Sequence, residues 1–393
     1  MEHMSPHHAG KAIARERKLA GLSQQQLANR LVYSVSLLRA VEQGRRVASP
    51  ALLAKAARVL RVEPEQLTGT PYRDTIEQDG PLEGSTELRA ILAEGAYVEP
   101  VEPWPLERLQ AELNDIDRAY FADQGRVALA RLPEVIRRLY GVLHEASDTA
   151  RVCTMLSQAF LTAERLCRRF GFTSLAPSVI DRLEWTAERA DDPLYGPQAL
   201  IKRARILMYY DRADLGLNLI ERGLNSISGE GEGVDAVRGS AHLTGAIIAA
   251  RGFRPDVAED HLREARRIAA PMRHESDAYG TLFGPVNVGI HTAAVALESG
   301  DPGKAAHEGS NLTLPRKTAP PRAGHHWQDV SRAWLMIGKP DQALAALNRA
   351  RLVAPQQTKL HPSVRETVYG IAAAQRRRSE GLVGFASWLG TTL

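Results

Sequence analysis

Few side chains in this sequence are placed to bind a metal ion or to act as nucleophiles. Cys153 and Cys167 lie fourteen positions apart, with no CxxC pair and no histidine at metal-ligand spacing, so we expect two reduced, structural thiols. The pairs His7-His8 and His325-His326 lack the further ligands that a metal site needs. We therefore predict neither a metal ion nor a cofactor.

The signatures of common enzyme classes are also missing. The sequence has no GxxxxGK[ST], HExxH or GxSxG motif and no GxGxxG after a strand, which are patterns that hold phosphates, zinc or an activated serine. We therefore expect a protein that is not an enzyme.

Positive charge is concentrated at one end of the chain. Residues 1–70 contain eleven Lys or Arg and five Asp or Glu, a net charge of +6, whereas the remainder contains 39 basic and 41 acidic residues, a net charge of −2. A small basic unit attached to a nearly neutral body is the distribution that a polyanion-binding module requires.

At 393 residues the chain also exceeds the ~250 to 300 residues of one hydrophobic core, which predicts at least two folding units.

The basic unit reads as a bundle of short helices. Apolar residues recur at helical spacing from Gly10 to Leu67, and we expect five helices around one core. Ser23 and Ser34 are placed as N-caps of the second and third helices, Gly44 as the end of the third, and Ser49-Pro50 as the start of the fourth. The expected core residues are Ile13, Leu19, Leu27, Leu31, Leu38, Val41, Leu52, Leu53, Ala56, Ala57 and Leu60.

The segment LSQQQLANRLVYSVSLLRAVEQGRR, from Leu22 to Arg46, resembles the phage-repressor-type helix-turn-helix family, also called the xenobiotic-response-element (XRE) type. Leu27-Ala28 matches the packing dipeptide of the first motif helix, and Ala28 has the small side chain that lets two helices cross closely. The resemblance covers about sixty residues and implies an all-α, five-helix lambda-repressor-like domain that docks in a DNA major groove.

The same resemblance implies which residues face DNA. Gln24 would contact phosphate or an adenine edge, Arg39 a guanine, and Arg45 and Arg46 phosphates. The remaining implied positions are Val35, Ser36, Leu37 and Ala40. Ser36 would make a polar contact to a base, and Val35 or Leu37 would lie against thymine methyl groups. Alternatively, Val35 and Leu37 are core residues, although Leu37 and Leu38 cannot both point inward. The basic residues Lys11, Arg15, Arg17 and Lys18 are expected on a solvated helix face.

One feature departs from the family. The tight turn between the motif helices often carries glycine, whereas this chain has Val32 and Tyr33. Because a β-branched residue disfavours positive φ, we expect this turn either to avoid that conformation or to be strained.

Proline and glycine mark a connection after the basic unit. Between Gly69 and Pro105 the sequence is rich in both, with a short helical patch from Leu88 to Leu92. We predict a helix-turn-helix domain over 1–72, a linker with a short helix over 73–105, repeats over 106–360 and C-terminal capping helices over 361–393.

The larger part resembles a tetratricopeptide-repeat (TPR) α-solenoid. The clearest copy has the repeat's spacing at Trp327, Val330, Ser331, Trp334, Gly338, Ala343, Leu347, Ala350 and Pro355. Small Ser331 and Ala343 would let paired helices approach, and weaker copies turn at Gly125, Gly171, Asp211, Gly252 and Gly300. In this repeat family the first helices line the inner face, which makes Arg203, Asn287, His291, His325 and Trp327 candidate ligand contacts.

The two resemblances together imply a transcription regulator with a TPR-like sensor domain, controlled by a signalling peptide or small molecule. We expect a homodimer on a pseudo-palindromic double-stranded DNA operator, because one recognition helix contacts too few bases for useful selectivity. The alternative is an interaction scaffold that uses the helix-turn-helix as a docking module.

The N-terminus has no apolar signal core and no long apolar run follows, which favours a cytoplasmic protein without membrane contact. The Arg- and Ala-rich composition favours an actinobacterial source.

Overall fold

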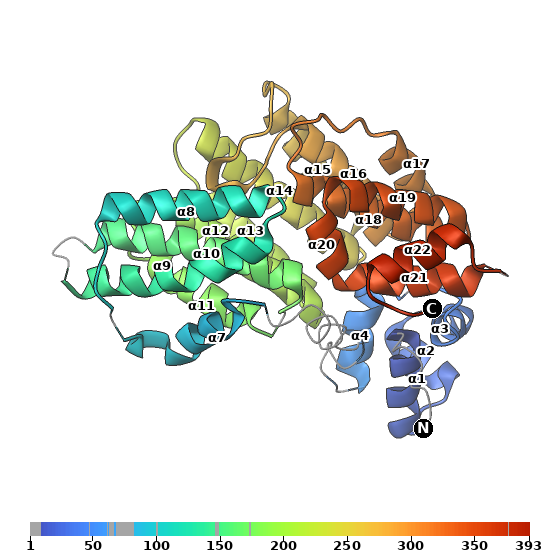
Figure 1. The fold of residues 1–393 in the computed structure, drawn as a ribbon. Coiled ribbons are helices and arrows are strands. Elements are labelled where there is room, and N and C mark those ends of the chain that lie inside the picture. Colours follow the sequence, from blue (N-terminus) through green and yellow to red (C-terminus); the bar gives the residue numbers. More distant parts are fainter. Residues whose placement is uncertain are drawn as a thin grey trace.

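The computed structural model describes residues 9–46, 48–60, 62, 67, 82–99, 101–145, 149–172, 174–375 and 377–393. Within these residues the regular secondary structure is helical, apart from an isolated bridge between Ser276 and Phe283. The predicted all-α fold is confirmed. Figure 1 shows α1–α4, in blue, grouped apart from a much larger helical body.

The N-terminal group has its own core. Its helices are α1 (Ala9–Leu19), α2 (Gln24–Leu31), α3 (Val35–Glu42) and α4 (Pro50–Leu60). Ile13, Leu27, Leu31 and Leu38 are fully buried together, as their spacing predicted, whereas Leu19 is 75% exposed because it lies at the end of α1. Most residues of the predicted fifth helix lie outside the described residues, but Leu67 is buried in the same core.

The short helix predicted near Leu88 is present and is not a free connector. It forms α7 (Ser85–Glu94), followed by η1 (Gly95–Tyr97). Leu88 and Ile91 are fully buried in the first core of the larger body, and Gly84 lies so close to the backbone of Leu129 that a Cβ would clash. This end of the predicted linker is therefore anchored by apolar burial.

Beyond α7, successive helices form hairpins that stack on one another (Figure 1). The pairs are α8 (Leu106–Phe121) with α9 (Gly125–Glu145), α10 (Ala150–Phe170) with α11 (Ala176–Ala187), α12 (Tyr195–Leu207) with α13 (Ala213–Ser226), α14 (Glu232–Arg251) with α15 (Pro255–Ala269), α16 (Pro285–Glu298) with α17 (Pro302–Asn311), and α18 (Pro320–Met336) with α19 (Pro340–Val353). The 3-10 segments η2 (Met208–Tyr210) and η3 (Ala278–Gly280) follow α12 and precede α16. Stacked hairpins of this kind make an α-solenoid.

The predicted turn residues lie inside these hairpins. Gly125, Gly171, Asp211, Gly252 and Gly300 each fall at the junction between the two helices of a pair. In the last pair, the buried Ser331 hydroxyl donates to the Ala343 carbonyl at 2.7 Å. The two small residues therefore bring α18 and α19 into close contact, as the repeat spacing predicted.

The C-terminal helices cover the last hairpin. They are α20 (Pro355–Leu360), α21 (Pro362–Ala374) and α22 (Glu380–Trp388). Val364, Val368, Leu382 and Phe385 are buried against the apolar face that includes Leu347. Without this cover, the end of the solenoid would expose that face to water.

The two ends of the solenoid also meet. The Asp123 carboxylate, in the first hairpin turn, accepts hydrogen bonds from the backbone N–H groups of Gln356 (2.8 Å) and Gln357 (2.9 Å) at the start of α20. In return, the Gln356 side chain accepts a bond from the Arg126 N–H at 2.8 Å. These contacts join residues more than 200 positions apart, so the solenoid curls until its last helices touch its first.

No described helix is long and apolar enough to cross a membrane. Among the same residues there is also no group of three or more His, Cys, Asp or Glu side chains that could hold a metal ion. Cys153 and Cys167 are free, buried thiols, and burial raises the pKa of Cys167 to about 12.

Candidate nucleic-acid interface

Local hydrogen bonds set the boundaries of α2 and α3. Ser23 accepts a bond from the Gln26 N–H (3.1 Å) while Gln26 Oε1 accepts one from the Ser23 N–H (2.8 Å), a reciprocal capping box. The Ser34 hydroxyl caps α3 by accepting from the Leu37 N–H at 3.2 Å. Gly44 follows α3 with φ +72°, so the three predicted boundary residues act as expected.

The turn between these helices adopts the strained conformation. Val32 has φ 59° and ψ 44°, in the left-handed region that a β-branched residue disfavours, and it is 80% exposed. The Tyr33 N–H donates to the Ala28 carbonyl at 3.0 Å and the Val32 N–H to that of Asn29 at 3.2 Å. These bonds close the turn and hold Val32 in place.

A buried ion pair connects α1 to the C-terminal end of α3. Arg17 donates to Glu42 through Nε (2.6 Å) and Nη2 (2.9 Å), and to the Leu22 carbonyl through Nη1 (2.7 Å). Glu42 also accepts from Gln24 Nε2 at 2.7 Å, and Gln24 Oε1 accepts from Arg39 Nε at 3.3 Å. One chain of bonds therefore positions Arg39, predicted to contact a guanine, and Gln24, predicted to contact a phosphate or an adenine edge.

Arg17 corrects an expectation. It was predicted on a solvated helix face with its basic neighbours, but it is 8% exposed because Glu42 attracts it inward across 25 positions of sequence. The hydrogen bond to Glu42 raises the pKa of Arg17, which keeps the guanidinium charged. Sequence reasoning missed the pairing; an arginine in the last turn of α1 with a glutamate ending the recognition helix is the signal for it.

The other predicted residues divide by exposure. Ser36, Arg39, Arg45 and Arg46 are exposed, whereas Gln24, Val35, Leu37 and Ala40 are half-buried. Val35 and Leu37 pack on the edge of the core while Leu38 occupies its centre, so both readings of these two residues hold in part. Polar and basic groups therefore lie at the surface of α3 and the loop after it, with apolar groups between them.

Comparison with known families decides what this unit is. A family model described as a helix-turn-helix domain matches residues 8–68. The chain carries a helix-turn-helix domain. No curated protein sequence matches the chain.

Two solved structures are similar to the chain over longer stretches. BtubC (BKLC) from P. vanneervenii is 15% identical with a TM-score of 0.37, covering 63% of this chain and 91% of its own. PlcR from Bacillus thuringiensis, solved with the peptide PapR7 and DNA, is 13% identical with a TM-score of 0.36, covering 87% of this chain and 100% of its own. Both TM-scores are below 0.5, so the overall likeness to either structure is weak.

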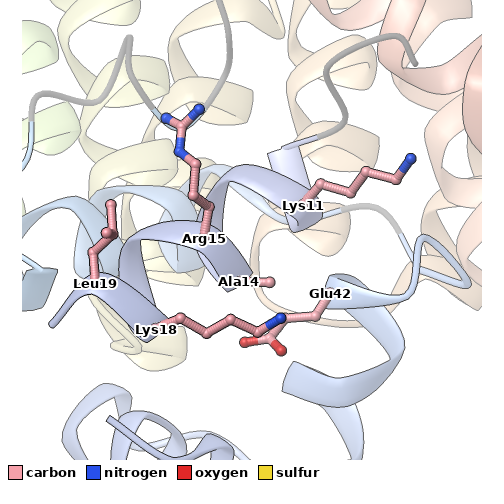
Figure 2. Close-up of a pocket in the computed structure, with 6 residues that line it drawn as sticks. All are labelled: Lys11, Ala14, Arg15, Lys18, Leu19 and Glu42. Atoms are coloured by element: carbon pink, nitrogen blue, oxygen red, sulfur yellow. The ribbon is translucent and has the colours of Figure 1, made fainter. Parts of the chain in front are cut away.

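The helix-turn-helix domain has a basic outer face on α1. Lys11, Arg15 and Lys18 are exposed and line a shallow depression with Ala14, Leu19 and Glu42 (Figure 2). The depression lies beside the end of α3, so these side chains add positive potential next to the recognition helix.

Two turns of the solenoid touch the helix-turn-helix domain. Tyr33, in the motif turn, packs edge-on against Phe253 with ring centroids 6.1 Å apart, and the Lys55 ammonium lies 4.5 Å from the Phe253 centroid. Arg58 Nη2 is 3.1 Å from an Asp211 carboxylate oxygen. Tyr33, which departs from the family pattern, is therefore a contact residue of the solenoid.

The structure brings together some of the predicted ligand contacts and separates others. Asn287 and His291 on α16 both contact Arg322 on α18, and His325 lies nearby with its ring 5.4 Å from that of His361. Arg203 instead pairs with Asp181 (2.6 Å) and Glu184 (2.7 Å). Trp327 is 9% exposed and packs in a small apolar cluster, with the Arg349 guanidinium 4.6 Å from its ring.

Proposed function

We propose that this protein is a sequence-specific DNA-binding transcription regulator. The observation that carries the proposal is the bonded chain from the buried Arg17–Glu42 pair through Gln24 to Arg39. A guanidinium held in a fixed place on the recognition helix can form the paired hydrogen bonds that guanine offers in the major groove. The surrounding charge supports the same function, since residues 1–70 carry a net charge of +6.

The assigned roles divide into base reading and anchoring. Arg39, Gln24 and Ser36 read base edges, and Val35, Leu37 and Ala40 face the groove as its apolar contacts. Arg45 and Arg46, exposed in the loop after α3, anchor phosphates without sequence preference.

The regulator acts as a homodimer in the cytoplasm. An eight-residue recognition helix covers too few base pairs to select one site in a genome, so two copies would read a pseudo-palindrome. The solenoid receives a peptide or small-molecule signal, and the contact of Tyr33 with Phe253 gives the solenoid a way to reposition the motif turn. The protein works by binding and not by catalysis.

The test is selection of sequences from a random duplex library by the full-length chain. We expect the selected duplexes to contain two half-sites about one helical turn apart. Binding to them should be at least about a thousandfold tighter than to shuffled duplex and should weaken steeply with salt. Sedimentation of the complex should give two chains for each duplex.

The opposite result is equally clear. If no duplex is enriched, and if any binding to duplex DNA does not weaken as the salt concentration rises, the protein is instead an interaction scaffold. A matched variant, Arg39→Ala, should lose affinity for the selected duplexes while keeping its affinity for shuffled duplex. Equal loss on both would remove Arg39 from the base-reading set.

A further inference from the structure

The first helices of three hairpins bring buried and half-buried basic side chains together inside the solenoid. They are Arg168 and Arg169 on α10, Lys202 and Arg205 on α12, and Arg322 on α18, which we call the inner basic cluster. Their charges act on one another. Burial and the charges of Arg169, Arg205 and Arg168 together lower the pKa of Arg322 to about 9.

Three of these arginines have neutral hydrogen-bond partners. Arg322 donates to the Asn287 side-chain oxygen (2.6 Å) and lies 2.8 Å from Nδ1 of His291, which burial and Arg322 itself keep neutral by lowering its pKa. Arg205 donates to the Thr244 hydroxyl at 3.0 Å, and Arg169 to the Tyr120 hydroxyl at 2.9 Å. None of the three has a described carboxylate within 4 Å.

Lys202 is the most unusual member. Its side chain is buried at 7% exposure, and it forms no hydrogen bond or ion pair with any described residue. Burial lowers its pKa well below the usual value; the Glu164 carboxylate acts in the opposite direction, whereas Arg205 and Arg165 lower the pKa further. A largely buried ammonium without a hydrogen-bonded partner is costly to the fold, since charges removed from water need compensation.

Glu164 is the one carboxylate inside the cluster, among the residues that the structure describes. It is fully buried, lies 3.4 Å from Arg168, and neither of its oxygens has a hydrogen bond. Although burial raises its pKa, Arg168 and Lys202 lower it to about 2, so it carries its charge. One negative charge thus faces five basic groups.

The carboxylates around the cluster are already engaged. Asp117 pairs with Arg165 at 3.2 Å, and Asp329 pairs with Arg332 at 3.0 Å. Asp123 accepts the backbone bonds at the start of α20. The excess positive potential is also visible at the buried Tyr120, where burial raises the pKa but Arg169 and Arg168 lower it below its usual value.

From this arrangement we propose that the inner basic cluster binds a small anion with two or more negative charges, of the organic phosphate or polycarboxylate type. Guanidinium groups match both chemistries with paired, charge-assisted hydrogen bonds. Lys202 and Arg169, at 7% and 8% exposure, are too enclosed for a duplex to reach, which separates this site from the DNA-binding face. The regulatory meaning of the site rests on the proposed function, because such an anion would be the signal that the solenoid receives.

The experiment measures thermal unfolding of the full-length chain by tryptophan fluorescence, with pyrophosphate or citrate added at constant ionic strength. All five tryptophans, the earliest of which is Trp104, lie in the solenoid or the segment packed on it, so the signal reports this region. We expect a saturable rise of the Tm with at least one anion and none with matched NaCl. The anion that acts at the lower concentration identifies phosphate or carboxylate chemistry.

Variants locate the site. Lys202→Met should raise the Tm without anion by about 2 °C or more, since it removes a buried cation that has no hydrogen-bonded partner, and should weaken anion binding roughly tenfold. Arg322→Ala should weaken binding at least as much. Arg203→Gln, one position from Lys202 on α12 but paired outside the cluster, should leave binding unchanged, as should the double variant Arg45→Ala/Arg46→Ala.

Two results would overturn the proposal. One is the absence of any rise beyond NaCl with either anion, and the other is a lower Tm for Lys202→Met, which would show that this lysine is structural. Neither measurement involves DNA, so a failure here is separate from a failure of the DNA-binding test. If both functions hold, the active anion should change the affinity for the selected duplex in the wild type but not in Lys202→Met.

Discussion

Guanidinium groups gather in two places in this molecule, and their surroundings give them different tasks. Arg39, Arg45 and Arg46 lie at the surface of the helix-turn-helix domain, where water and salt screen their charges beyond ~10 Å. Arg169, Arg205 and Arg322 lie inside the solenoid, where the lower effective dielectric strengthens every interaction. Exposed cations suit a long polyanion that binds through many weak contacts, whereas enclosed cations suit a small anion that fits among them.

The two regions also treat a buried cation differently. In the helix-turn-helix domain, Arg17 has a bidentate partner in Glu42, and Glu42 also accepts a hydrogen bond from Gln24. In the solenoid, Lys202 has no partner of this kind. The first arrangement is complete and holds a structure in place, while the second is complete only when a ligand supplies the missing charge.

The largest effect is expected from Glu42→Gln. The substitution leaves Arg17 buried without a counter-charge, which should cost the helix-turn-helix domain about 3 to 5 kcal/mol of unfolding free energy. Amide hydrogen exchange in α1–α3 of the full-length chain should accelerate strongly, while the tryptophan transition of the solenoid stays in place. Glu16→Gln, which removes only a pairing with the half-exposed Arg15, is the matched control and should change little. Equal effects of the two substitutions would contradict the role given to Glu42.

Next in size are the two kinds of arginine on the DNA-facing side. Arg39→Ala should cost about 1 to 3 kcal/mol on the selected duplex and little on shuffled duplex. Arg45→Ala should weaken both and reduce the slope of log K against log salt by about 0.9, the contribution of one phosphate contact. Titrations at several salt concentrations by fluorescence anisotropy measure both quantities. A reversed pattern would exchange the base-reading and phosphate roles.

Val32→Gly should stabilise the helix-turn-helix domain. The left-handed conformation of Val32 costs roughly 1 to 2 kcal/mol, and glycine removes this strain while adding about 0.5 to 1 kcal/mol of conformational entropy loss. We expect a net gain of up to about 1.5 kcal/mol, measured by hydrogen exchange in α2 and α3. Val127→Gly, in the regular helix α9, should instead destabilise its own region. A loss at Val32 would show that its side chain has a contact that the strain argument omits.

The local features of the fold could be predicted from sequence because neighbours in the chain determine them. The caps at Ser23 and Ser34, the end of α3 at Gly44 and the contact of Ser331 with Ala343 depend on residues within a few turns. At Val32 the sequence left two outcomes open, a turn that avoids positive φ or a strained turn, and the structure has the strained one.

The long-range features could not be predicted in the same way. The Arg17–Glu42 pair, the bonds from Asp123 to α20 and the inner basic cluster each join residues from separate helices. A repeat pattern places a residue on a first helix, but the curl of the solenoid decides which first helices face each other. Arg203 and Lys202 show the difference, since adjacent positions on α12 point into opposite environments.

The smallest effect is expected where the two regions touch. Arg58 is 63% exposed in its pairing with Asp211, and a surface ion pair of this kind contributes at most about 1 kcal/mol. The cation–π contact of Lys55 with Phe253 adds about 0.5 to 1 kcal/mol. Arg58→Ala should therefore shift unfolding of either region by less than about 0.5 kcal/mol, while hydrogen exchange near Tyr33 and Phe253 increases a few fold.

A small effect on stability here would carry a functional meaning. Contacts of this strength can be exchanged at low cost when a ligand changes the solenoid, since a population shift needs only a few kcal/mol of differential binding. Lys11→Ala, which changes the charge of the helix-turn-helix domain by the same amount on its outer face, separates charge from contact, and it should leave exchange near Phe253 unaltered. A loss of several kcal/mol in Arg58→Ala would instead mean that the two regions form one cooperative unit, and the helix-turn-helix domain could then not be repositioned by its solenoid.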